Sequence, residues 1–501
     1  MTQNRNREPA FLAIDAGTGD CRVIAFSAEG RVLASACTEW TYEKSASEME
    51  DCREFAPDAC FGSICSLIRR VVADLDGCAV AAVTVTSQRD GMAFLDAAGR
   101  ELYCAPNMDL RGKAVLAELE PFANEILQST GLPLHAMFGL PRLLWQKRFQ
   151  PDVYERIDCA LMLCDWIAYR LSGEKRSERS AAGSSQMFSL ARDVYDDALL
   201  GRLGLKTGIF PNSCFGDEPA GTLMAAIAAE TGLPKGVPVF TGGSDTHCAL
   251  TGMGLLQAGA TAVVAGTTTP VLAVCDRPLI DPMGGAFSNP GTLKGQWTLE
   301  CNAGSTGLSL RWVRELFCPE REDAFAYIDR EAEKVSPGCD GMQAYIGITL
   351  SGEPMRANLG GFLFPVPWNV SDFSRAHFFR AALETNAFAV YANLESLRSL
   401  GAKAPDVLHV CGGQSKSAPF LGMLADLCGL PVQTYELAEC TALGAALLAA
   451  KGSGHFATLE EAAKSFVRPK EPVVPREDGM RVYGELYGKW HELRAQLVEL
   501  S

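Results

Sequence analysis

Apolar and polar positions along the chain follow two alternating patterns, one typical of strands and one of amphipathic helices. The first apolar run covers residues 11–16, ends in a polar, glycine-rich turn and returns as a second run up to Phe26. After another turn at residues 28–31, residues 32–40 fit a third strand. Short apolar runs joined by glycine-containing turns are typical of antiparallel hairpins. The chain therefore begins with a predicted antiparallel meander.

A similar strand, Gly/Thr turn and strand recurs at residues 261–274, roughly 250 positions later. Because the two turns match in their chemistry, they predict an internal duplication with one hairpin in each half. Helical patterns cover residues 57–75, 378–400, 418–428 and 441–451, and strand patterns cover residues 80–87, 91–96, 406–411 and 430–435. This alternation predicts α/β layers with parallel strand pairs. Residues 483–500 fit a surface helix.

Composition narrows the class of protein. The 501 residues, 48% hydrophobic and 21% charged, suffice for two to four domains with a large core and exclude bulk disorder. The formal net charge of -15 argues against binding to nucleic acids or anionic membranes. The 18 cysteines are scattered without a C-x-x-C pair, and the six histidines lack zinc-ligand spacing. With no run of ~18 apolar residues and no signal-peptide core, we expect a soluble cytoplasmic protein with free thiols.

The first glycine-rich turn, Asp15-Ala-Gly17-Thr18-Gly19, has the chemistry of a phosphate-binding loop. Glycines let backbone amides approach phosphate oxygens closely, and Thr18 adds a hydroxyl donor. Asp15 stands at the strand end with a carboxylate suited to Mg²⁺, and Arg22 returns toward the turn on the second strand. An ordinary hairpin with a turn-capping Asp has the same local pattern, so both interpretations stay open.

A second candidate is Asp245, which follows an apolar run and the glycines at 242 and 243. We expect these glycines to remove bulk around the carboxylate and leave it facing a cleft. A carboxylate in that place can accept the proton of an attacking hydroxyl during phosphoryl transfer. The alternative is an Asp that caps the following helix.

Polar clusters follow strand-like runs at residues 87–91 and 107–111. They supply the directed donors and acceptors that a sugar or polyol requires, although a solvated charged loop has the same composition. The loop at residues 412–417 lies between a strand and a helix, where free amides can meet a nucleotide, or where serines simply cap the helix. It lacks the glycine that precedes the lysine of a P-loop, and Arg22 stands where a dinucleotide fingerprint requires glycine.

Together these motifs resemble the FGGY family of carbohydrate kinases, from Phe11 to about Gly454. They occur in the family's order: a first phosphate loop at residues 15–22, the catalytic G-x-D at 243–245, a second nucleotide turn at 266–268, the adenosine-side glycines at 412–413 and a closing helix motif at 439–446. The resemblance implies an α/β protein with the actin/hexokinase-like fold. Its two RNase H-like domains would be residues 1–252 and 253–501, with a cleft between them.

The resemblance also implies an ATP-dependent kinase that uses Mg²⁺ and phosphorylates a hydroxyl of a small sugar or polyol. Asp245 would be the general base, and Asp15 and Asp245 would be associated with the metal. The implied sugar contacts are Gln88, Arg89, Asp90, Asp109, Arg111 and Thr246. The implied nucleotide contacts are Gly17, Thr18, Gly19, Arg22, Gly266, Thr267, Thr268, Gly412, Gly413, Gln414 and Ser417.

Within the family, the N-terminal half is most similar to the autoinducer-2 kinases. The residues that carry this similarity include Arg89-Asp90-Gly91, Asn107-x-Asp109-x-Arg111 and residues 141–145. Thr246-His247-Cys248 departs from that subgroup, so a pentulose or tetritol stays an alternative acceptor to the autoinducer-2 precursor. An actin-like ATPase and a non-catalytic sugar-binding protein are the alternatives from other classes. Both a monomer and a homodimer are compatible with the sequence.

Overall fold

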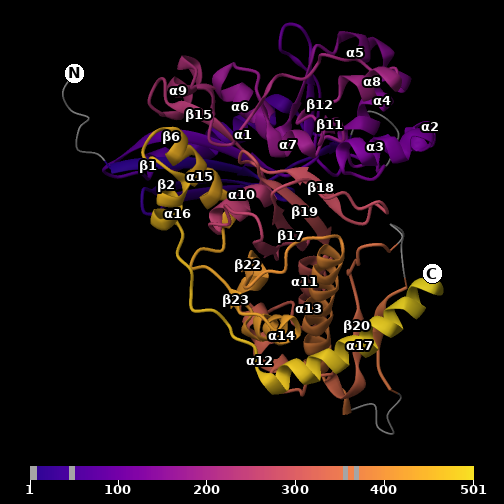
Figure 1. Cartoon of the computed structure of the whole chain (residues 1–501). Coiled ribbons are helices and arrows are strands. Elements are labelled where there is room, and N and C mark those ends of the chain that lie inside the picture. Colours follow the sequence, from indigo (N-terminus) through magenta and orange to yellow (C-terminus); the bar gives the residue numbers. More distant parts are fainter. Residues whose placement is uncertain (1–7, 45–50, 354–358, 366–371) are drawn as a thin grey trace.

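Two six-stranded sheets, one in each half of the chain, organise the structure (Figure 1). The computed structural model describes residues 8–44, 51–353, 359–365 and 372–501. In Figure 1 the first sheet lies in the upper lobe and the second in the lower lobe, with helices packed around both. The alternating strand and helix patterns of the sequence are thus realised as two α/β lobes.

The first sheet has the order β14-β15-β6-β1-β2-β3. Its strands are β1 (Glu8–Ala16), β2 (Asp20–Ser27), β3 (Val32–Glu39), β6 (Cys78–Ser87), β14 (Pro219–Thr222) and β15 (Pro238–Ser244). The predicted meander is confirmed, because β1, β2 and β3 pair antiparallel in sequence order. β6 then pairs parallel to both β1 and β15. The carboxyl ends of three parallel strands therefore share one edge of the sheet.

The second sheet has the order β18-β19-β17-β16-β22-β23. Its strands are β16 (Thr261–Val264), β17 (Pro270–Cys275), β18 (Phe287–Pro290), β19 (Trp297–Asn302), β22 (Leu408–Cys411) and β23 (Val432–Gln433). Again an antiparallel hairpin is followed by an antiparallel strand on one side and by parallel strands on the other. This shared order confirms the internal duplication. The strand predicted at 430–435 is shorter than expected, at Val432–Gln433.

The principal helices lie close to their predicted positions. They are α1 (Pro57–Ala73), α13 (Arg375–Ser399), α14 (Ala418–Cys428) and α17 (Glu477–Glu499). The prediction of α17 as a surface helix is only half right, because Trp490 is 1% exposed and lies 5.4 Å from the Phe388 ring of α13. The helix also begins earlier than the sequence pattern indicates. α17 therefore helps to close the core of the second lobe.

Helix α15 (Cys440–Gly452) comes from the C-terminal half but packs on the first sheet, where its apolar side chains join Phe11 in one buried cluster. It crosses α10 (Asp245–Gly252) at two glycines. A Cβ on Gly444 or on Gly252 would lie 1.9 Å from a carbonyl oxygen of the other helix. The two helices therefore meet backbone to backbone, which fixes the helix that begins with Asp245.

The lobes exchange segments around this crossing. The predicted division at residues 252 and 253 falls between the two sheets along the sequence, whereas α15 and α16 (Leu459–Phe466) return to the first lobe. Figure 1 shows α15 and α16 beside β1 and β2, far from α14 and α17. The two lobes are thus held together by more than a single linker.

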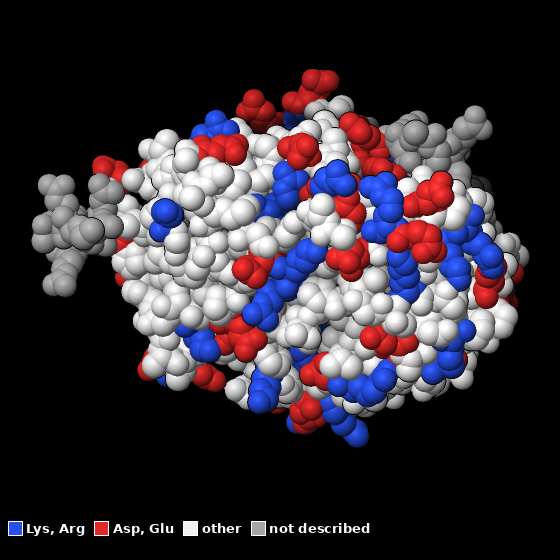
Figure 2. Space-filling view, turned by 90° about the horizontal axis from the view of Figure 1, so that it is seen from above, with Lys and Arg blue, Asp and Glu red and all other residues white. Residues whose placement is uncertain are grey.

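Charges of both signs are interspersed on the face seen from above in Figure 2, where the described residues form no extended patch of one sign. All 18 cysteines are unpaired, and most are buried. Among the described residues, the helices are too short or too polar to traverse a bilayer.

Candidate active site

Sheet register brings three of the predicted site segments to one edge. Asp15 of β1 and Gly243 of β15 both pair with Thr86 of β6. The residues that follow these strands therefore lie side by side: the turn after Asp15, the stretch 88–90 after β6, and Asp245 at the start of α10. Carboxyl ends of parallel strands are the usual place for a binding site in an α/β sheet.

The first turn is held by its carbonyl oxygens. Gly17 O accepts hydrogen bonds from Trp40 Nε1 at 2.7 Å and from Gln88 Nε2 at 3.2 Å, and Thr18 O accepts one from the Tyr42 hydroxyl. A trans peptide places each carbonyl opposite the next amide. The amides of Thr18 and Gly19 therefore point away from these donors, and neither finds a partner among the described residues. This leaves amides free for an anion, as a phosphate loop requires.

Asp245 occupies the first turn of α10, after the extended residue Ser244. The preceding glycines have a different role from the one expected. Gly243 has φ 115°, and a Cβ there would lie 2.6 Å from Ser180 Oγ, while a Cβ on Gly242 would press on Thr84 and Ala445. They are therefore required for close packing behind the strand end, and they position Asp245 rather than clear space in front of it.

Three carboxyls at this edge have raised pKa values. Burial raises the pKa of Asp15 to about 7, and the nearby charge of Asp245 adds to the effect while Arg22 opposes it. Burial likewise raises the pKa of Asp90 to about 7, against the opposing charges of Arg89 and Arg142. Burial also raises the pKa of Asp245, although Arg89 acts against it. Groups with such shifts in a shared recess are candidates for proton transfer and metal binding.

Arg89 reaches across to the second lobe. Its Nη1 and Nη2 donate to the two carboxylate oxygens of Glu300 on β19 at 2.6 and 2.8 Å. A second link between the lobes runs from Ser244 Oγ to His247 Nδ1 at 2.7 Å and from His247 Nε2 to Thr298 Oγ1 at 2.9 Å. Burial lowers the pKa of His247 to about 3, so this link joins neutral groups. The candidate site therefore includes residues from both sheets.

The remaining predicted sugar contacts differ in whether their polar groups already have hydrogen-bond partners within the protein. Asp109 is fully buried and accepts hydrogen bonds from Tyr103 Oη at 2.5 Å and Arg111 Nε at 2.7 Å. Arg111 is itself buried between the rings of Tyr103 and Trp145, each 4.7 Å away. Thr246 Oγ1 is buried and has no hydrogen-bond partner among the described residues. Asp109 is thus fully engaged within the protein, whereas Arg111, which also donates to Glu54 Oε1 at 2.5 Å, keeps a buried Nη1 without a hydrogen-bond partner among the described residues.

Gln88 connects the first turn to the 107–111 loop. Its Nε2 donates to Gly17 O, and its Oε1 accepts a hydrogen bond from the backbone N–H of Asn107 at 3.1 Å. Asn107 Nδ2 in turn donates to Thr18 Oγ1 at 3.0 Å. Asp90 has φ 66°, a conformation uncommon outside glycine, and Arg142 holds its carbonyl at 2.7 Å. These contacts fix the first turn, the stretch 88–90 and the 107–111 loop relative to one another.

A cavity of about 560 Å³ opens in the second lobe beside the second Gly/Thr turn. Its lining includes the predicted residues Gly266, Thr267, Gly413, Gln414 and Ser417. β16 and β22 pair so that Val264 lies opposite Cys411, which brings both turns to the same sheet edge. Thr268 and Gly412 do not line the cavity; Gly412, at φ 89°, instead packs closely on Ala265.

Comparisons with known proteins agree with this geometry. The N-terminal domain of the FGGY family of carbohydrate kinases matches residues 10–252, and its C-terminal domain matches residues 261–453. The chain belongs to the FGGY family of carbohydrate kinases. Curated relatives include the autoinducer-2 kinases of Salmonella paratyphi B, 30% identical over 96% of this chain and 93% of the relative, and of Klebsiella pneumoniae, 29% identical over 98% and 94%.

Solved FGGY-type structures show the same fold. The xylulose kinase of Lactobacillus acidophilus superposes with a TM-score of 0.87 at 21% identity, covering 98% of both chains. The glycerol kinase of Plasmodium falciparum with ADP gives 0.84 at 17% identity, covering 97% of this chain and 98% of that one. The actin/hexokinase-like fold expected from the sequence is thereby confirmed, and the chain is an ATP-dependent carbohydrate kinase.

Sequence reasoning missed several residues of this candidate site. Glu300 lies on a strand that the hydrophobic pattern did not reveal, and nothing near it in sequence marks it as a partner of Arg89. Arg311, Phe325 and Asp329 line the cavity of the second lobe from α11 (Thr306–Phe317) and α12 (Ala324–Ala332). The stretch 310–312 contributes to the similarity to autoinducer-2 kinases, but nothing in the sequence predicts that Arg311, Phe325 or Asp329 lines a cavity, so only the packed structure places them there.

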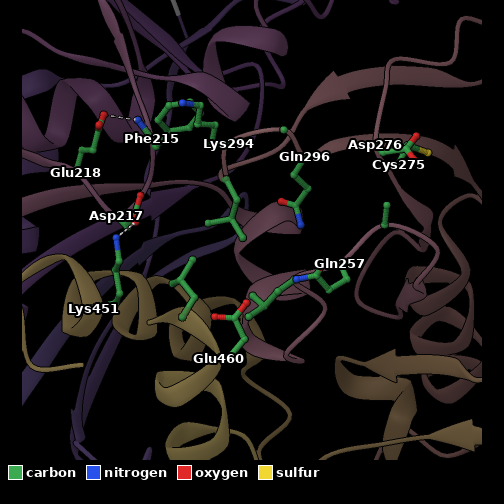
Figure 3. Close-up of a pocket in the computed structure, with 15 residues that line it drawn as sticks. Phe215, Asp217, Glu218, Gln257, Cys275, Asp276, Lys294, Gln296, Lys451 and Glu460 are labelled. Atoms are coloured by element: carbon green, nitrogen blue, oxygen red, sulfur yellow. Dashed lines mark hydrogen bonds and ion pairs between the residues drawn. The ribbon is translucent and has the colours of Figure 1, made fainter. Parts of the chain in front are cut away.

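A second cavity between the lobes, of about 590 Å³, lies away from the candidate site (Figure 3). Its lining comes from the 215–218 loop, the residues before β16 and the β18–β19 loop. Lys451 at the end of α15 forms an ion pair with Asp217 at one side of the cavity. Cys275, at the end of β17, pairs with Trp297 at the edge of the sheet opposite to the Gly266 turn. This cavity therefore lies at the ends of these strands that are opposite to the Gly266 turn and to the cavity of about 560 Å³.

Proposed function

We propose that this FGGY kinase transfers the γ-phosphoryl group of ATP to a hydroxyl of a small, neutral sugar or polyol, with Asp245 as the general base. The observation that carries the proposal is the position of Asp245. It begins a helix at the shared sheet edge, beside the amide-bearing turn of the first lobe and the Arg89–Glu300 contact to the second. A positioned carboxylate there accepts the proton as the acceptor oxygen attacks phosphorus.

The nucleotide is proposed to span both lobes. The free amides of Thr18 and Gly19 would contact the phosphates from the first lobe, with Arg22 nearby, while the cavity beside Gly266 and Gly413 would hold the adenosine. The size of that cavity, about 560 Å³, suits a bound small molecule. Spreading one ligand over two lobes ties its binding to their relative position.

Mg²⁺ is proposed to bind at Asp15 and Asp245. Both carboxylates are partly exposed, and the charge of Asp245 contributes to the raised pKa of Asp15. Oxygen donors of this kind fit Mg²⁺, which usually keeps several waters and needs only one or two protein carboxylates. When bound, the ion would neutralise charge on the phosphate oxygens. The chain itself orients the acceptor and receives its proton at Asp245.

The acceptor proposed first is the autoinducer-2 precursor, because the near full-length relatives reported above are autoinducer-2 kinases. A pentulose or a tetritol is the alternative of the same class. The test is kcat/KM for the precursor beside erythritol, glycerol, xylulose and ribulose. If any of these four exceeds the precursor tenfold, about 1.4 kcal/mol in transition-state preference, the autoinducer proposal fails and only the sugar-kinase proposal stands.

Two proposals from other classes are tested in the same assay. An actin-like ATPase would hydrolyse ATP at the same rate with or without an acceptor. A sugar-binding protein without catalysis would bind an acceptor and leave ATP intact. ADP release that depends on an added polyol excludes both. We also place the enzyme in the cytoplasm, a proposal supported by its 18 unpaired cysteines.

A further inference from the structure

An ion pair joins Arg89, in the polar stretch 87–91 of the first lobe, to the second lobe. Arg89 donates to both carboxylate oxygens of Glu300, at 2.6 and 2.8 Å. Both side chains are withdrawn from solvent, with 17% of Arg89 and 1% of Glu300 exposed. Paired, charge-assisted hydrogen bonds of this kind fix a guanidinium in one orientation. A strand of one lobe thus holds an arginine of the other.

The same face of β19 contacts the helix that contains Asp245. Glu300 and Thr298 are two residues apart in a strand, so their side chains point to the same side. Thr298 is hydrogen-bonded to His247 of α10, and Glu300 to Arg89. One face of β19 therefore contacts both Arg89 and the helix that begins with Asp245.

Arg89 is surrounded by carboxyl groups. Burial lowers the pKa of Arg89, but the carboxylates of Glu300, Asp90 and Asp245 outweigh it and shift that pKa upward. Of these three groups, Glu300 is the one that forms paired hydrogen bonds with the Arg89 guanidinium. The nearby cation Arg142 directs its Nη groups to the backbone carbonyls of Asp90 and Met137, at 2.7 and 2.6 Å. Neither arginine presents a free cationic fork to a ligand.

We propose that Glu300 makes the acceptor site selective for neutral polyhydroxy compounds over sugar acids. Glu300 occupies the pair of Arg89 N–H groups that would clamp a carboxylate, and it neutralises the charge of Arg89. A guanidinium has five N–H groups, so those that remain can still donate to hydroxyl oxygens. Glu300 is therefore a positioning residue that acts through Arg89. The inference rests on the proposed function, because it names the acceptor class of the same site.

Calorimetric titration with a matched five-carbon pair, D-xylulose and sodium D-xylonate, tests this. Wild type should bind xylonate at least tenfold more weakly than xylulose. In Glu300→Gln, which is isosteric but neutral, xylonate binding should tighten at least tenfold while xylulose binding changes less than threefold. Glu300→Asp keeps the charge and should retain the selectivity of wild type. A purely structural role for Glu300 would weaken both ligands together.

The matched control is Glu353→Gln. Arg494 of α17 donates to both carboxylate oxygens of Glu353 at 2.8 and 2.6 Å, so this substitution removes the same charge from a similar pair outside the site. It should leave the xylulose-to-xylonate ratio unchanged. Equal binding of the two ligands by wild type, or no gain in xylonate affinity in Glu300→Gln, overturns the inference; if the Gln variant does not fold, the wild-type ratio decides.

The outcome is separable from that of the proposed function. Failure of wild type to phosphorylate any neutral acceptor in the ATP-consumption assay would refute the kinase proposal, whatever the binding ratios. Turnover of neutral acceptors together with unchanged selectivity in Glu300→Gln would refute only the role of Glu300.

Discussion

At the scale of single residues, a substitution at Asp245 distinguishes a catalytic role of this carboxylate from a role in capping the helix. Asp245→Asn should lower kcat by ~10²–10⁴, the usual contribution of a positioned base, with little change in the melting temperature. The measurement is acceptor-dependent ADP release together with a thermal melt. Asp58→Asn is the matched control, since Asp58 also lies in the first turn of a helix but is exposed on α1. Near-normal turnover in Asp245→Asn would show that Asp245 is not the general base.

The raised pKa of Asp15 has a consequence for stability. A carboxyl whose pKa moves from 3.8 to about 7 on folding binds more protons in the native state between those two values, so its contribution makes stability fall as pH rises through that range. Asp15→Asn should therefore melt at a higher temperature than wild type at pH 8, by a margin that shrinks towards pH 5. Mg²⁺ should raise the melting temperature of wild type more than that of the variant. An equal margin at both pH values would contradict this.

At the scale of elements, the crossing of α10 and α15 makes a sharp prediction. A Cβ on Gly444 would lie 1.9 Å from Cys248 O and 2.6 Å from Gly252 N, and neither backbone atom can move without shifting a helix. Gly444→Ala should reduce the free energy of unfolding by about 1–3 kcal/mol, as overpacking does, and also lower kcat because α10 begins with Asp245. Chemical denaturation and turnover measure the two effects.

The control for that substitution is Gly422→Ala in α14, where a Cβ would meet no atom within 4 Å. Alanine in place of glycine inside an unobstructed helix is worth about 0.5–1 kcal/mol of added stability. Gly422→Ala should therefore be neutral or stabilising, with unchanged turnover. If both variants behave alike, the backbone contact between α10 and α15 is not what constrains position 444.

The elements also show why the sequence was informative in some places and silent in others. The hairpins with their Gly/Thr turns, and α14 between Ser417 and Gly429, are encoded by residues close together in the chain, so local pattern predicts them. The contact of Arg89 with Glu300 joins residues 211 positions apart, and β18 and β19 have no distinctive alternation. Likewise, the spacing of Asp109 and Arg111 could not show that they pair with each other, nor that Arg111 keeps one buried N–H group without a partner among the described residues.

At the scale of the whole molecule, two lobes that each supply part of the site should close on the substrates. Binding of an acceptor together with a non-hydrolysable ATP analogue should reduce the radius of gyration, because closure excludes water from the transferring phosphoryl group. Small-angle scattering measures the change, and sedimentation in the same buffers shows whether a homodimer forms. A radius that is constant in all states would count against closure.

The return of α15 to the first sheet also affects how the protein is made. During synthesis, the strands of the first lobe are complete once Ser244 has emerged, yet the helix that covers Phe11 and Phe240 ends only at Gly452. At 5–20 residues per second, the ribosome needs roughly 10–40 s to supply the intervening stretch. Throughout that interval an apolar face of the nascent sheet lacks its cover. The first lobe is therefore expected to remain incompletely folded on the ribosome and to depend on chaperones until nearly the whole chain has been translated.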